Sequence, residues 1–177
     1  MNMIQTMQQI PSMNKQVIFD IESTGLLRQG SRIHCIVMRG GDDGSTSVFD
    51  HRPEQSIIQG VKELEQADLH ICHNIIGYDI PLIQEQFPDF KPQGKAVDTL
   101  VLSRLFYPHI QDRDYERRPH GMPQRLYGRH KCFKGDFGKH EGGWSVYTPE
   151  MLDYCIQDTE VTLKLWALMK RRMEDYS

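Results

Sequence analysis

Two acidic residues, Asp20 and Glu22, follow the apolar residues 17–19 and are separated by one residue. The apolar run predicts a strand, on which residues two apart project from the same face, roughly 6–7 Å apart along it. Two carboxylates on one face suit Mg²⁺ or Mn²⁺, which prefer oxygen ligands, better than zinc. Residues 23–25 then predict a sharp exit that brings backbone amides close to both carboxylates. A strand end that reaches solvent has the same pattern, so the pair is interpreted together with later acids.

A further acid, Asp79, ends the segment 73–79, which directly follows a short apolar run at residues 69–72. Pro81 suits the first turn of a helix, so Asp79 is predicted to lie at a helix start. Its carboxylate could therefore cap the helix N-terminus, and it could bind a metal there as well.

Tyr154 and Asp158 form a third candidate group in the last predicted helix. Residues four apart lie on one face of a helix, about 6 Å apart along its axis. A phenol and a metal-binding carboxylate could thus face the same point. The ordinary surface of a helix shows the same spacing. The pair indicates a metal site only when it is considered together with the other acids.

The elements that must position these residues follow from the spacing of apolar residues. Apolar runs bounded by turn residues predict strands at 16–21, 32–38, 45–49 and 69–72. Apolar residues three or four apart predict helices at 54–67, 80–87, 99–107 and 149–173. A glycine- and aspartate-rich turn at 40–44 joins two of the strands as a hairpin. This order predicts an α/β layered fold around a mixed sheet.

The overall composition favours one folded domain. The chain has 177 residues, 38% of them hydrophobic and 25% charged. The net charge of −3 disfavours a protein held on nucleic acid mainly by a basic surface, and favours a soluble enzyme with a small substrate. No apolar run approaches the roughly 18 residues of a membrane span, and the first residues do not resemble a secretory signal. We therefore expect a cytoplasmic protein without membrane contact.

Four cysteines without regular spacing also favour a reducing cytoplasm. Cys35 and Cys72 lie in apolar runs, where a small buried thiol is ordinary. A zinc site built from His120, His130, Cys132 and His140 is not favoured, because their spacing fits no common zinc pattern.

The domain organisation has two unusual parts. Residues 1–14 are rich in glutamine and methionine and predict a flexible leader before a single domain at 15–177. Residues 108–147 are too long for a passive connection in a compact domain. They hold eight Lys/Arg and five Asp/Glu, so this segment carries +3 while the rest of the chain carries −6. We expect this basic connection to lie near the candidate site.

The three groups, in order, read D-x-E-x-T-G, H-N-x-x-x-Y-D and Y-x-x-x-D. This pattern resembles the 3′-to-5′ exonucleases of the DnaQ-like, ribonuclease-H-like superfamily, in the tyrosine (DEDDy) branch. The histidine branch would carry a histidine where this chain has Asp153. The run 98–105 further resembles the proofreading exonuclease domain of the family A DNA polymerases of podovirus-type phages, and the likeness extends over residues 16–168.

The resemblance implies a ribonuclease-H-like α/β fold with a central mixed five-stranded sheet flanked by helices. It also implies two Mg²⁺ or Mn²⁺ ions per active site, one of them held by Asp20, Glu22 and Asp158. Asp20 would bridge to the second ion, which Asp79 would hold directly or through water. Tyr154 would orient or deprotonate the attacking water.

The same resemblance implies a set of substrate-binding residues. Thr24, Gly25 and Leu26 would meet the terminal nucleotide, and Asn74 would meet the backbone behind it. Asp98 also matches the phage pattern, but we expect a structural role for it, as the cap of the helix at 99–107.

These expectations add up to a two-metal 3′-to-5′ exodeoxyribonuclease that releases nucleoside monophosphates from single-stranded DNA 3′ ends. Because the chain ends at Ser177 without a polymerase domain, we expect a stand-alone, phage-encoded exonuclease in the bacterial cytoplasm. It would serve in replication proofreading with a separate DNA polymerase chain, or in DNA degradation. Two alternatives stay open: an exoribonuclease of the ribonuclease D type, and a catalytically silent module that docks on nucleic acid or a polymerase.

The basic connection generates a first prediction. Replacing Arg117, Arg118 and Arg129 by glutamine should raise the substrate KM and weaken its dependence on salt, because these cations would steer the strand toward the site. Steady-state kinetics at several NaCl concentrations measure both effects. Unchanged kinetics at every salt concentration would exclude a steering role.

Overall fold

The computed structural model describes residues 15–25, 27, 30–109 and 143–175. It contains a five-stranded sheet in the order β3-β2-β1-β4-β5. The strands are β1 (Gln16–Ser23), β2 (Ile33–Gly40), β3 (Thr46–Phe49), β4 (Leu69–Cys72) and β5 (Lys95–Asp98). β2 pairs antiparallel with β1 and β3, whereas β4 pairs parallel with β1 and β5. The expected mixed five-stranded sheet is thus confirmed.

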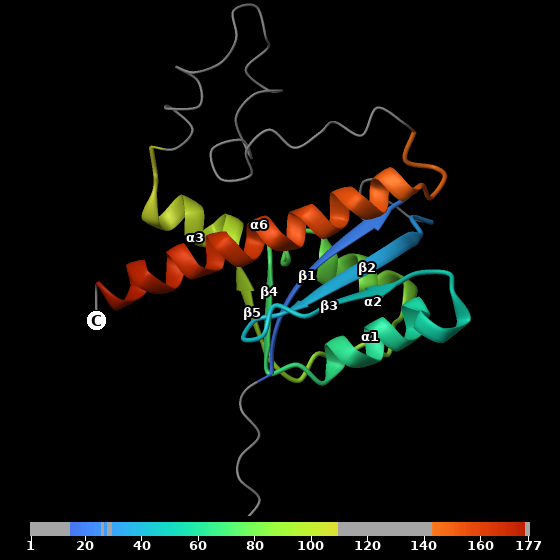
Figure 1. Ribbon diagram of the computed structural model, residues 1–177, viewed down its shortest axis with the longest axis horizontal. Helices are drawn as coiled ribbons and strands as arrows, with labels where there is room; N and C mark the ends of the chain where they lie inside the picture. The colour runs from blue at the N-terminus through green and yellow to red at the C-terminus, as the bar shows by residue number, and fades with distance from the viewer. Residues whose placement is uncertain (1–14, 26, 28–29, 110–142, 176–177) are drawn as a thin grey trace, which may run out of the picture.

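Helices cover both faces of this sheet (Figure 1). They are α1 (Ile57–Glu65), α2 (Asp79–Gln86), α3 (Thr99–Phe106) and the long α6 (Pro149–Glu174). α6 crosses one face with α3 beside it, and α1 and α2 lie on the other face (Figure 1). The layered α/β arrangement follows from the apolar faces of these helices, which bury themselves against the sheet.

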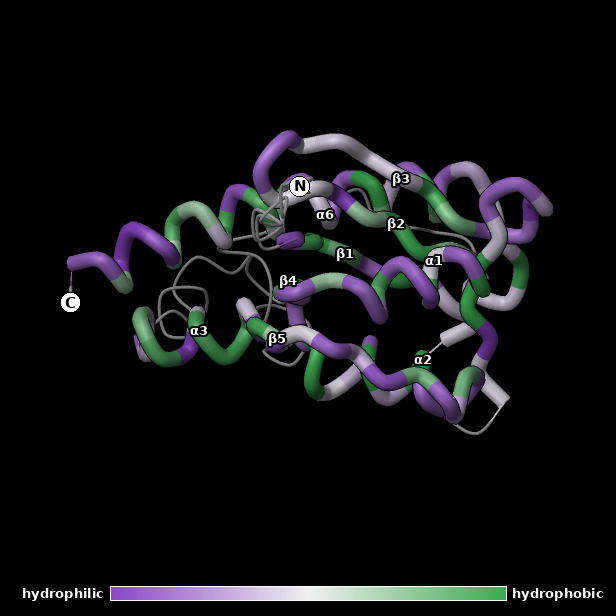
Figure 2. The backbone as a smooth tube through the Cα atoms, turned by 90° about the horizontal axis from the view of Figure 1, so that it is seen from below, coloured by the Kyte–Doolittle hydropathy of each residue, from purple (hydrophilic) through white to green (hydrophobic). Residues whose placement is uncertain are grey.

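The central strand β1 is buried on both faces. Phe19 and Ile21 belong to the core that includes α1 and α2, while Ile18 packs with Leu165 and Trp166 of α6. In Figure 2, β1 and β2 carry hydrophobic stretches, and the carboxyl end of α6 is hydrophilic. Since side chains alternate along a strand, Asp20 shares the α6 side of the sheet with Ile18.

Two details of the sequence prediction were wrong. The strand β5 was missed, because it is short and its first residue, Lys95, is exposed at the sheet edge. The helix expected at 54–67 is divided into a 3₁₀ turn, Pro53–Gln55, and α1. Ser56 divides them, because its hydroxyl and the Gln59 side chain form a capping box that starts α1.

Several sequence predictions lie outside the described residues. They are the leader at 1–14, the candidate residue Leu26, the residues 110–142 of the basic connection, and the histidines and cysteine weighed as zinc ligands. Among the described residues, no helix has both the length and the apolar character needed to cross a bilayer.

Gly94 generates a prediction about the start of β5. A Cβ at this position would overlap the backbone carbonyl oxygens of Ala67 and Asp68, which precede β4. Gly94→Ala should therefore lower the free energy of unfolding by about 1–3 kcal/mol, because the crowding atoms are backbone and cannot move aside cheaply. Urea denaturation measures this loss. Gly143→Ala is the matched control, since its Cβ would meet no atom nearer than Ser145 Oγ at 3.8 Å; equal stabilities of the two variants would contradict the prediction.

Candidate active site

The carboxyl ends of three parallel strands meet at one edge of the sheet. β1 ends at Ser23, β4 ends at Cys72 and β5 ends at Asp98, with Cys72 directly opposite Asp98 in the register. In open α/β sheets, ligands bind outside this edge. The topology therefore brings together the first two predicted groups, which lie more than 50 residues apart in the sequence.

Asp20 and Glu22 form the first cluster with a thiol from α6. Carboxylate oxygens of the two acids and the sulfur of Cys155 all lie within 4.8 Å of one another. Glu22 is buried, at 6% exposure, whereas Asp20 is half-buried. The structure thus places both acids on one side of β1, as their spacing predicts.

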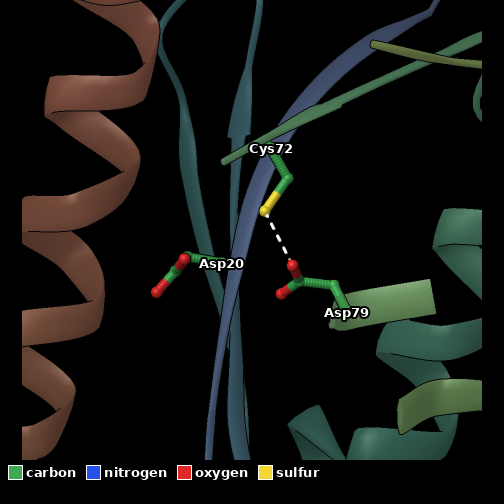
Figure 3. A group of neighbouring side chains, drawn as sticks. All are labelled: Asp20, Cys72 and Asp79. Atoms are coloured by element: carbon green, nitrogen blue, oxygen red, sulfur yellow. Dashed lines mark hydrogen bonds between the residues drawn. The ribbon is translucent and has the colours of Figure 1, made fainter. Parts of the chain in front are cut away.

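A second cluster joins Asp20 to Asp79 on α2. One oxygen of each acid and the sulfur of Cys72 lie within 4.8 Å of one another. Figure 3 shows these side chains, with Cys72 Sγ donating a hydrogen bond of 3.2 Å to Asp79 Oδ2. Asp79 is the first residue of α2 and is 2% exposed. The alternative that Asp79 is the N-cap residue does not hold, because Tyr78 occupies that position and no side-chain hydrogen bond caps this end.

The two clusters share Asp20, and each is a group of side chains that could hold a cation. Their donors include three carboxylates, which are the ligands that Mg²⁺ and Mn²⁺ prefer. Asp20, Glu22 and Asp79 therefore fit the kind of divalent cation that the sequence led us to expect.

Helix α6, which packs against β1, carries the remaining candidates. The Thr148 side chain caps its N-terminus, and Cys155 Sγ lies 3.4 Å from the backbone oxygen of Asp20. Asp158 lies three residues after Cys155, close to the same helix face, and is 3% exposed, while Tyr154 is half-buried. Asp158 belongs to neither cluster. The structure thus brings Asp20, Glu22 and Asp79 together and holds Asp158 one turn of α6 beyond Tyr154.

The exit from β1 is held by a tyrosine. Tyr78 Oη donates a hydrogen bond of 2.7 Å to the Gly25 carbonyl oxygen and lies 2.6 Å from Ser23 Oγ. Thr24 stabilises the other side of the turn, since its Oγ1 accepts a hydrogen bond from the Arg32 amide. Gly25 has φ of 153°, a value that glycine adopts far more readily than other residues. The turn that carries the expected nucleotide contacts Thr24 and Gly25 is therefore fixed in place.

The pKa of Tyr78 reports the charge of this site. Burial raises the pKa of its phenol most strongly, and the negative charges of Asp79, Glu22 and Asp20 raise it further, against a lowering by the Ser23 hydrogen bond. Tyr78 therefore stays neutral and keeps its proton for the Gly25 carbonyl. Burial likewise raises the pKa of the Cys155 thiol, with the Cys35 hydrogen bond and the charge of Asp20 acting in the same direction.

Asp98 holds the loop between β4 and α2. Its carboxylate accepts from the amides of Leu100 and Val101, which confirms the expected cap of α3. It also accepts from the amides of Asn74, at 3.0 Å, and Ile76, at 3.3 Å. Asn74 has φ of 71°, a conformation that asparagine tolerates well. Asp98 thus fixes the loop that leads into Asp79.

Three residues at this site were not predicted from the sequence. Tyr78 lies inside the second motif and Cys155 lies inside the third. Their positions in these motifs could have marked them as site residues, but no role was assigned to them. Cys72 was expected to be an ordinary buried thiol; it is fully buried, but its sulfur contacts Asp79. No spacing rule connects Cys72 to Asp79 or Cys155 to Asp20, because these contacts depend on the tertiary fold.

The sequence of the chain is similar to two phage DNA polymerases. The chain is 27% identical to the DNA-directed DNA polymerase of Escherichia phage T7 over 192 residues, and 26% identical to that of Enterobacteria phage T3 over 190 residues. Each alignment covers 90% of this chain but only 27% of the polymerase. The chain therefore spans about a quarter of the length of these relatives.

Similar folds occur among solved nucleases. Brucella melitensis NrnC bound to pGG has a TM-score of 0.60 at 21% identity, and the same protein with bound Mg²⁺ has 0.58 at 21%; both matches cover 91% of this chain and 74% of NrnC. Escherichia coli RNase D, an exoribonuclease, has a TM-score of 0.56 at 15% identity, over 91% of this chain and 40% of RNase D. The family model of the RNase_H superfamily matches residues 17–114, which include β1 to β5 and Asp20, Glu22 and Asp79. The sheet, its acidic edge and this match, which covers more than half of the sequence, place the chain in the RNase_H superfamily.

Proposed function

We propose that this protein is a 3′-to-5′ exonuclease that hydrolyses phosphodiester bonds at DNA 3′ ends and releases nucleoside monophosphates. The observation that carries the proposal is the shared position of Asp20, which belongs to both ligand clusters. Membership of the RNase_H superfamily supports a nuclease, and the likeness to phage DNA polymerases supports DNA as the substrate.

The acids have distinct parts in this proposal. Asp20, Glu22 and Asp158 would hold one Mg²⁺ or Mn²⁺, and Asp79 would hold a second that Asp20 bridges. When bound, such a pair neutralises charge that develops on the phosphate and supports attack by water at neutral pH. Asp158 would have to move to complete the first position, since it lies outside both clusters.

Tyr154 would act on the attacking water by orientation. It lies on α6 one turn before Asp158 and is half-buried. An ordinary tyrosine has a pKa of about 10 and is a poor base at neutral pH. A neutral phenol still accepts a hydrogen bond from water and fixes its direction of approach.

The substrate would lie along the exit from β1. Thr24, Gly25 and Leu26 would contact the terminal nucleotide, and Asn74 would contact the backbone behind it. The hydrogen bonds that fix Gly25 and Asn74, from Tyr78 and to Asp98, support such preorganised contacts. Because the chain spans about a quarter of the polymerases it resembles, proofreading together with a separate polymerase chain is part of the same proposal.

Digestion of end-labelled oligonucleotides tests this function. With Mg²⁺ or Mn²⁺, matched single-stranded and 3′-mispaired DNA should be shortened stepwise from the 3′ end. Asp20→Asn, which keeps the side-chain size but removes the charge, should lower the rate by more than about 100-fold. Faster digestion of matched RNA would establish an exoribonuclease instead. Binding of single strands without hydrolysis under either metal would establish a docking module.

The hydrogen bond from the Tyr78 hydroxyl to Gly25 leads to a further prediction. Tyr78→Phe removes one of two donors to the Gly25 carbonyl and leaves only the Ser23 hydroxyl, so the turn at Thr24 and Gly25 loosens. The KM for DNA should rise by about 5- to 10-fold, the equivalent of one hydrogen bond, with a smaller change in kcat. Tyr107→Phe is the control, because it removes a hydroxyl that contacts Arg172 on the far part of α6. Equal KM values for the two variants would contradict the role of Tyr78.

A further inference from the structure

Two buried thiols flank Asp20, one in each ligand cluster. Cys155 shares its cluster with Asp20 and Glu22, and Cys72 shares its cluster with Asp20 and Asp79. Both cysteines are fully buried, and they come from different elements, α6 and β4. The site is therefore built from sulfur as well as oxygen donors.

Sulfur changes which cations such a site selects. Mg²⁺ takes oxygen ligands and has little affinity for sulfur, whereas Zn²⁺ and Cd²⁺ bind thiolates strongly and accept four ligands of mixed type. Two carboxylates and one thiol, all within 4.8 Å, supply three donors for such an ion on either side of Asp20.

We propose that this site binds thiophilic divalent cations, Zn²⁺ or Cd²⁺, through Cys72 and Cys155 together with the carboxylates of Asp20, Glu22 and Asp79. On binding, each thiol that becomes a ligand releases one proton to solvent and its sulfur bonds to the metal, with no change of oxidation state. Asp20 is the half-buried member of both clusters, and the other members are buried.

The contacts of the two sulfurs distinguish them from a third buried cysteine. Cys72 Sγ faces a carboxylate, at 3.2 Å from Asp79 Oδ2, and Cys155 Sγ lies 3.4 Å from the Asp20 backbone oxygen. Cys35 is equally buried and lies next to Cys155 in the core, but it belongs to neither cluster. Cys35 is thus the natural control for a buried thiol that does not bind metal.

One consequence rests on the proposed nuclease function. A thiophilic cation and Mg²⁺ would compete for Asp20, since both clusters contain it. Zn²⁺ should therefore inhibit Mg²⁺-dependent hydrolysis, and removal of the two thiols should relieve the inhibition more than it changes the Mg²⁺ requirement.

Cadmium titration tests the inference without any need for activity. The experiment uses the full chain with Cys132→Ser, so that the thiol of Cys132, which lies outside the described residues, cannot add to the cadmium signal. The ultraviolet charge-transfer band of a Cd²⁺–thiolate bond should appear on titration. Cys72→Ser and Cys155→Ser should each reduce the band, and the double variant should lose it and bind Cd²⁺ at least about 10-fold more weakly. Cys35→Ser should retain the full band.

Mn²⁺ binding, followed by electron paramagnetic resonance, separates ligation from structural damage. Loss of a sulfur ligand weakens Cd²⁺ far more than Mn²⁺, whereas loss of folding weakens both alike. Absence of the band in the parent protein, or an equal band in the double variant, would overturn the inference. A cysteine-dependent band without exonuclease activity would support the thiol site and refute the proposed function. Exonuclease activity without the band would support the proposed function and refute the thiol site.

Discussion

The site depends on one costly arrangement, in which carboxylates are gathered at a single edge of the sheet and removed from water. Glu22 and Asp79 are each 6% exposed or less, and the half-buried Asp20 shares one cluster with each of them. Like charges this close repel one another, and burial removes the solvent that would screen them. Such a cluster persists only if its backbone cannot relax. The remaining structure can be understood as the means of holding that backbone.

Three supports act on it from different directions. The strand β1 is paired with β2 at Asp20 and Glu22 and with β4 at residues 16–18, so both acids lie on a strand that two ladders hold in place. The helix α6 packs across β1 and touches Asp20 through Cys155. On the far side, four backbone amides converge on Asp98, which ties the loop before Asp79 to the start of α3. Each support uses a different kind of interaction, namely ladder pairing, core packing and charge-assisted hydrogen bonding.

The sequence predicted the parts of this site that obey local rules. Asp20 and Glu22 were found by the two-residue period of a strand, and Tyr154 and Asp158 were placed on one helix by the four-residue spacing. The capping role of Asp98 also follows from local geometry and was confirmed. The sulfur contacts of Cys72 and Cys155 escaped prediction, since they join elements that only the tertiary fold brings together. The strand β5 escaped because its four residues are few and partly exposed, so that pairing with β4 rather than its own pattern defines it.

The charge of the chain takes on a different meaning once the site is known. Its formal net charge is −3, and the four candidate metal ligands, Asp20, Glu22, Asp79 and Asp158, contribute −4 to that sum. The apparent acidity is therefore concentrated at one edge of the sheet and says little about the rest of the surface. In the proposed function, a phosphodiester would be repelled by these carboxylates until their charge is neutralised, so cation binding and nucleic-acid binding at this edge would be coupled. A mildly acidic protein would then act on a polyanion, because the charge that opposes the substrate is the same charge that attracts the cations.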